Sequence, residues 1–173
     1  MLIDFINNGL YDRFVMTSAS GIRNLIFMTG WISSVIGLYK MHQQGITKGQ
    51  KKIFIVQLVL LSLANIWNIA EIINPLSTSQ IVFLLNFSWP LGGLFMIVTG
   101  IAVIKANKMK GWKKYAALLT GFWFPQTLVM AWFNLESLTA IMLSGVYAAI
   151  SFGLLGFSLI ASSEDGMARR VFA

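Results

Sequence analysis

The sequence predicts an all-α integral membrane protein, built as a bundle of five transmembrane helices. Of its 173 residues, 57% are hydrophobic and only 11% are charged, whereas about a quarter of the residues in a soluble domain are charged. Charged residues are also absent from long stretches, such as Ile72 to Ile104 and Ser137 to Ser163. A helix that crosses a bilayer needs about 20 mostly apolar residues. We therefore expect residues 1–173 to form a single membrane domain.

Five apolar segments of suitable length lie between turn and charge signals. Asn74-Pro75 marks the end of the second segment as a turn. Pro90 and Pro125 interrupt the third and fourth, because each proline removes a backbone hydrogen bond from its helix. The expected spans cover residues 20–39, 53–73, 81–104, 115–134 and 138–161.

The two ends of the chain are expected to lie outside the spans. In residues 1–17, apolar side chains recur at helical spacing with polar ones between them. This pattern is typical of an amphipathic helix on the membrane surface, and equally of a helix that caps the bundle. Residues 162–173 form a polar tail.

The distribution of lysine predicts the orientation. The connections after the first and third spans are rich in lysine, whereas the alternate connections, 74–80 and 135–137, hold neither lysine nor arginine. Because basic residues accumulate in cytoplasmic loops, we expect the N-terminus outside and the C-terminal tail in the cytoplasm. The loop lysines are Lys40, Lys48, Lys51, Lys52, Lys105, Lys108, Lys110, Lys113 and Lys114.

This topology also accounts for the formal net charge of +7. Besides the lipid bilayer itself, we expect the lysine loops to contact anionic lipid headgroups. Two short basic loops do not make a nucleic-acid surface, so no nucleic-acid partner is expected. The pattern fits a multi-pass protein of a plasma membrane or a bacterial inner membrane.

Polar side chains within the spans define a candidate binding site. Asn65, Asn68 and Glu71 share one face of the second span, with Asn65 near mid-membrane and Glu71 near the outer edge. Asn86 lies at a comparable outer depth, and Gln126 follows Pro125, where its side chain is expected to satisfy a freed carbonyl. In one interpretation Glu71 binds a proton or cation while the amides orient a substrate. In the other, the asparagines are interhelical hydrogen-bond partners contributing about 0.6 kcal/mol each, and Glu71 is an interfacial residue.

Small residues on the fifth span predict a helix-packing face. Gly145, Ala149 and Gly153 recur at four-residue spacing, which lets two helices approach closely. The partner is a helix of the same chain, a second copy or a larger membrane complex. Trp31 and Trp123, near mid-span, are expected to pack between helices.

Several chemistries are excluded by composition. The chain has no cysteine and a single histidine, His42, which falls in a predicted cytoplasmic loop. We therefore expect no metal site, no cofactor and no catalytic residues, because neither a histidine pair for a metal nor a Ser–His pair for catalysis can form within the membrane. The chain is not expected to be an enzyme.

Two short segments resemble known families. Phe124-Pro125-Gln126 resembles the Pro-Gln motif of PQ-loop transporters, but the motif is two residues long and the connection after it lacks lysine and arginine. Asn86-Phe87-Ser88-Trp89-Pro90-Leu91 is similar to the Asn-x-x-Trp-Ser-Pro-Leu segment of the tryptophan-rich sensory protein (translocator) family. That similarity covers half a helix and implies only an apolar ligand, since the first span lacks the family's Trp-Pro elements.

These features favour a non-catalytic membrane protein that binds or transports a small or lipid-like molecule through a polar site in the outer half of the bundle. The alternative is an accessory or structural subunit of a larger membrane complex, because nearly all the available contact surface is lateral.

Overall fold

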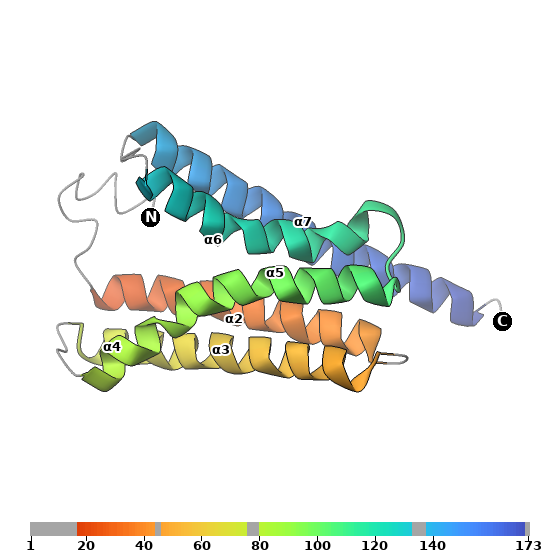
Figure 1. Ribbon diagram of the computed structural model, residues 1–173, viewed down its shortest axis with the longest axis horizontal. Coiled ribbons are helices and arrows are strands. Elements are labelled where there is room, and N and C mark those ends of the chain that lie inside the picture. The colour runs from red at the N-terminus through yellow and green to blue at the C-terminus, as the bar shows by residue number, and fades with distance from the viewer. Residues whose placement is uncertain (1–16, 44–45, 76–79, 133–137, 172–173) are drawn as a thin grey trace.

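The computed structural model describes residues 17–43, 46–75, 80–132 and 138–171, which are mainly helical and contain no strand. The helices form an elongated bundle, in which α5 contacts both α3 and α6 (Figure 1). The predicted all-α class is confirmed. The elements are α2 (Ser18–His42), α3 (Lys48–Ile73), α4 (Gln80–Asn86), α5 (Ser88–Ala106), the 3-10 helix η1 (Gly111–Tyr115), α6 (Ala116–Trp132) and α7 (Leu138–Val171).

Among the described residues, four helical segments are long and apolar enough to cross a membrane, with α4 and α5 contributing one of them jointly. Their length and composition support a membrane location. The predicted interfacial segment, apart from Thr17, lies outside the described residues. The four segments are Ser18–His42, Lys48–Ile73, Leu84–Ala106 and Met142–Ser162.

Two capping boxes extend the first helices beyond their predicted starts. Thr17 Oγ1 accepts a hydrogen bond from Ser20 N at 3.0 Å, and Ser20 Oγ accepts one from Thr17 N at 3.0 Å. Thr47 and Gln50 repeat the arrangement at the start of α3, at 3.2 and 2.9 Å. Because these side chains satisfy backbone N–H groups that a helix start leaves free, α2 begins at Ser18 and α3 at Lys48.

The prediction that His42 lies in a loop is wrong. His42 belongs to the last turn of α2 and is completely buried. Its Nδ1 lies 2.7 Å from Leu38 O, and its ring stacks on Phe54 at 6.1 Å between centroids. The helix continues to this residue because the histidine side chain bonds its own helix and packs against α3.

The third predicted span is broken at Phe87, three residues before the proline. Pro90 has no N–H and its ring excludes the carbonyl four residues earlier, which is that of Asn86. The chain therefore ends α4 at Asn86 and restarts as α5, which carries Pro90 in its first turn, where a missing N–H costs no hydrogen bond. At the break, Phe87 N bonds to Leu84 O at 3.2 Å.

In α6, by contrast, the helix continues through Pro125. The expectation that Gln126 satisfies a freed carbonyl is wrong. Its Nε2 contacts Met130 Sδ at 3.8 Å, and its Oε1 is buried without a hydrogen-bond partner among the described residues.

Glycines allow the closest contact between α5 and α6. A Cβ added at Gly100 would lie 2.5 Å from Leu118 Cα, and one added at Gly121 would lie 2.6 Å from Ile97 N. The face predicted for helix packing is different: a Cβ at Gly145 or Gly153 meets no described atom within 4 Å. That face of α7 is therefore uncovered within the described chain.

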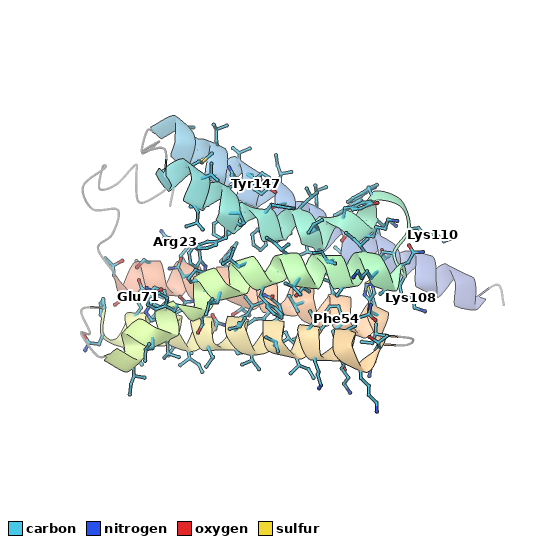
Figure 2. The ribbon with its side chains drawn as sticks, in the orientation of Figure 1. Arg23, Phe54, Glu71, Lys108, Lys110 and Tyr147 are labelled. Carbon is cyan, nitrogen blue, oxygen red and sulfur yellow. The ribbon has the colours of Figure 1, made fainter. Side chains whose placement is uncertain are left out.

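The lysine-rich connections lie at one end of the bundle. The end of α2, the start of α3 and the end of α5 are at the right in Figure 1. Gln50 Nε2 joins α3 to α5 near this end by donating to Ala102 O at 3.4 Å. Figure 2 shows Lys108 and Lys110 at this end, whereas Arg23 and Glu71 lie toward the other. The helix α7 continues past the predicted span to Val171.

Candidate functional site

The polar face of α3 contacts two neighbouring helices. In its first half, Gln57 reaches α5: its Nε2 donates to Gly92 O at 3.1 Å, and its Oε1 accepts from Thr99 Oγ1 at 3.3 Å. Gln57 and Thr99 are completely buried. Both ends of this amide are thus used in holding α3 against α5.

The two predicted asparagines connect α3 to α2 rather than to the third span. Asn68 Nδ2 donates to Asn65 Oδ1 at 3.3 Å, and Asn65 Nδ2 donates to Thr29 Oγ1 at 3.2 Å. The Thr29 hydroxyl in turn donates to Leu25 O at 2.7 Å. These bonds form a continuous chain of donors from α3 to the backbone of α2, which agrees with the interhelical interpretation of the asparagines.

Glu71 lies one turn further along α3, beside the start of α2. Its side chain is 3% exposed. The Ser20 hydroxyl donates to its Oε1, and Ser18 Oγ donates to the adjacent Ile72 O at 2.9 Å. The first turn of α2 contains no acidic residue of its own, so the Glu71 carboxylate provides the anion that a helix N-terminus favours by about 0.3–1 kcal/mol.

The second carboxylate oxygen of Glu71, unlike the first, lacks a hydrogen-bond donor among the described residues. Oε2 is buried and finds no hydrogen-bond partner among the described residues. A buried acceptor without a donor costs about 1–3 kcal/mol, and more when it is charged. Glu71 Oε2 is therefore a buried acceptor at the start of α2 for which the described part of the chain supplies no donor.

The other two predicted site residues lie apart from this group. Asn86 is the last residue of α4, and Gln126 lies on α6. Within the described ranges, neither hydrogen-bonds to Asn65, Asn68 or Glu71. The structure therefore brings together three of the five predicted residues and adds Ser20 and Thr29 from α2. We call Ser20, Thr29, Asn65, Asn68 and Glu71 the polar site.

The contribution of α2 had no clear signal in the sequence. Hydroxyls in an apolar helix commonly bond their own backbone, as Ser33 does to Thr29 O at 2.8 Å and Ser34 to Gly30 O at 3.0 Å. In the sequence, Ser20 and Thr29 cannot be told apart from Ser33 and Ser34. Only the position of α3 shows that Ser20 and Thr29 also bond to another helix.

A second feature is a cluster of aromatic rings from four helices. Phe152 of α7 contacts Phe27 and Trp31 of α2 at centroid distances of 4.8 and 5.1 Å, and Trp123 of α6 at 6.1 Å. Trp89 of α5 contacts Trp123 at 5.4 Å. Trp31 and Trp123 thus pack between helices, as expected. We call these rings, with Phe124, the aromatic cluster: Phe27, Trp31, Trp89, Trp123, Phe124 and Phe152.

Within the residues that the structure describes, no group of three or more His, Asp or Glu side chains is arranged to hold a metal ion. Searches of protein-family models, curated proteins and solved structures found no match to this chain. The fold and these two sites define a helical protein whose apolar helices are compatible with a membrane bundle.

Proposed function

We propose that the chain crosses the membrane five times, with α6 as the fourth span. Its 17 residues extend about 26 Å, and η1 precedes it without a break. The argument from connectivity is stronger: α5 ends at the lysine-rich end of the bundle and α7 begins at the opposite end (Figure 1). If α5 and α7 both cross, the chain between them must return across the same layer.

The proposed orientation has the lysine-rich end in the cytoplasm. Lys40, Lys48, Lys51, Lys105 and Lys108 are all exposed at the ends of their helices or in the adjoining connections. Gathering so many cations at one end supports a cytoplasmic position for that end, and contact with anionic headgroups follows from the same charge. The polar site then lies in the outer half of the bundle.

The absence of cysteine from the sequence makes this topology directly testable. Single cysteines replacing Asn74, Lys110 or Ser137 are treated in intact cells with a membrane-impermeant maleimide. We expect Asn74→Cys and Ser137→Cys to be labelled from outside, and Lys110→Cys only after permeabilisation. Labelling of Ser137→Cys and Lys110→Cys from the same side would mean that α6 does not cross.

Within this frame, we propose a non-catalytic membrane protein that binds or transports a small molecule at the polar site. The observation that supports it is the buried Oε2 of Glu71, which has no hydrogen-bond partner among the described residues. Because Oε1 already accepts from Ser20, the missing partner is a donor or a positive charge at Oε2. The ligand class that satisfies a carboxylate oxygen in this way is an ammonium or another protonated nitrogen.

The remaining polar groups stabilise the position of Glu71. Asn68 and Asn65 lie one and two turns deeper on the same face of α3, about 4.5 and 9 Å along the helix axis. Their bonds to each other and to Thr29 hold α2 and α3 together, so that Ser20 stays opposite Glu71. In this proposal the asparagines position the carboxylate and Glu71 binds the ligand.

The test is the retention of a small molecule by protein purified in native nanodiscs and examined by native mass spectrometry. We expect the wild type to carry one defined nitrogen base and Glu71→Gln to lose at least nine-tenths of it, because the amide has no charge to offer. The control, Thr99→Val, removes a buried interhelical hydrogen bond to Gln57 outside the polar site, and is expected to retain the ligand. Equal retention by Glu71→Gln would contradict the proposal.

A second candidate function is an accessory subunit of a membrane complex. The uncovered small-residue face of α7 favours it: Gly145, Ala149 and Gly153 are all exposed, and the two glycines have open space around them. The same preparation distinguishes the two functions. A stoichiometric protein partner without a small molecule supports the subunit, and a bound nitrogen base on a chain without such a partner supports the binding protein.

A further inference from the structure

The aromatic cluster contains two hydrogen-bond donors that find no acceptor in the part of the chain that the structure describes. Trp31 is 1% exposed and Trp123 is 8% exposed, and the Nε1–H of each is buried without a partner among the described residues. An indole N–H usually finds an acceptor when it is buried. Lipid chains cannot supply one, so each N–H left unpaired costs about 1–3 kcal/mol. Two such groups in one cluster require an explanation.

The two indoles belong to the same local environment. Phe27 contacts both of them at 6.2 Å, and Phe152 contacts both at 5.1 and 6.1 Å. Three of these four contacts are edge-to-face, an arrangement that aromatic rings prefer, and the fourth is tilted. A planar ring held in this cluster would therefore meet aromatic faces and edges together with two N–H donors.

One ring of the cluster lies at the bundle surface. Phe27 is 37% exposed, unlike Trp31 and Trp123, and the neighbouring Ile26 is 69% exposed. Gly30, one turn along α2, has open space around it. Phe27 thus contacts both buried indoles and also reaches the surface that faces lipid in a membrane.

We propose that the aromatic cluster is a binding site for an apolar, planar molecule bearing carbonyl oxygens, of which a quinone is the simplest class. The molecule enters from the lipid and takes the position of the Phe27 ring, which swings outward. Its carbonyl oxygens accept hydrogen bonds from the indole N–H groups of Trp31 and Trp123, and its ring keeps the aromatic contacts of the cluster.

The two donors lie apart from Glu71, the ligand-binding group of the polar site, although Thr29 of that site lies on α2 between Phe27 and Trp31. Trp31 is 11 residues from Ser20, whose hydroxyl donates to Glu71, or about 16 Å along α2. The polar site has an acceptor in need of a donor, whereas the aromatic cluster has donors in need of an acceptor. The inference does not rest on the proposed function, and Glu71→Gln is expected to leave quinone binding at the aromatic cluster unchanged.

The experiment is a titration of the detergent-purified full chain with decylbenzoquinone, with the fraction of protein carrying one probe molecule measured by native mass spectrometry. Decylbenzene, which has the same tail and no carbonyl, is the second probe. We expect saturable binding of the quinone to the wild type, and at least tenfold weaker binding of decylbenzene. Equal binding of the two probes, or no saturable quinone adduct, overturns the proposal.

The variants test the donors and the entry route. Trp31→Phe combined with Trp123→Phe keeps aromatic rings in place and removes both N–H groups, so quinone affinity should fall at least tenfold. Trp112→Phe is the matched control, because Trp112 stacks on Phe157 in a separate pair at 6.2 Å and should bind as the wild type does. Phe27→Ala keeps both donors and should increase the fraction bound. Unchanged binding in the double variant, or unchanged or weaker binding in Phe27→Ala, contradicts the assignment.

Discussion

Replacing Gly121 by alanine is expected to destabilise the bundle by about 1–3 kcal/mol, the cost typical of overpacking. The added Cβ would lie 2.6 Å from Ile97 N and 2.9 Å from Met96 C. Both are backbone atoms of α5, so no side-chain rotation can make room. The two helices must separate along their contact. Losing this close contact between α5 and α6 destabilises the bundle in lipid, because helices associate there mainly through close packing rather than through hydrophobic burial.

The control for this variant is Gly145→Ala. Gly145 also lies within a helix, but a Cβ there meets no described atom within 4 Å. Alanine is more favourable than glycine in a helix by about 0.5–1 kcal/mol, so this variant should be neutral or slightly more stable. Thermal unfolding of both proteins in the same detergent measures the difference. If Gly121→Ala is tolerated as well as Gly145→Ala, the α5–α6 contact is looser than the structure indicates.

The second large effect is expected for Ser20→Ala, which leaves Glu71 without its donor. The Ser20 hydroxyl donates to Oε1 of Glu71, and Oε2 already has no partner among the described residues. A buried carboxylate stripped of its last hydrogen bond costs more than the 1–3 kcal/mol typical of a neutral group. We therefore expect a loss of at least about 3 kcal/mol, measured by denaturant titration in mixed micelles.

Part of that loss comes from helix capping, and a matched variant separates it. Ser20 also accepts from Thr17 N in the capping box of α2, and Gln50 makes the equivalent bond to Thr47 N in α3. Thr47→Ala removes the capping hydroxyl of α3, which accepts from Gln50 N at 3.2 Å, and should cost about 1 kcal/mol without affecting any carboxylate. Ser20→Ala combined with Glu71→Leu should recover most of the excess, because removing both partners of a buried hydrogen bond is nearly neutral. If the double variant is no more stable than Ser20→Ala, the Ser20–Glu71 bond is not the source of the loss.

The helical fold and most helix positions were predictable because a bilayer imposes them locally. A run of apolar residues such as 138–161 must be helical in lipid, where every backbone group needs an internal partner. The helix ends were harder to predict. The capping boxes at Thr17 and Thr47 and the burial of His42 lengthen the helices by a few residues, and the break at Phe87 precedes the proline that causes it.

The candidate site was predictable only in part. Asn65, Asn68 and Glu71 share a face of α3 by helical periodicity alone, and the structure keeps them together. Their partners, Ser20 and Thr29, could not be found from periodicity because they are brought opposite α3 by helix pairing. Asn86 was grouped with them by depth in the membrane and Gln126 was named because it follows Pro125, and neither criterion specifies which helices are neighbours.

Glycine positions show the same division. The spacing of Gly145, Ala149 and Gly153 is a packing pattern, yet α7 presents this face away from the described chain, whereas Gly100 and Gly121 make the closest helix contact. Composition and charge determine that the chain forms apolar helices with its lysines gathered in alternate connections. Both properties depend on the transfer free energy of each residue by itself. Which helices pair, which glycines touch and which polar atoms remain unpartnered depends on contacts between residues distant in sequence, and only the tertiary structure decides them.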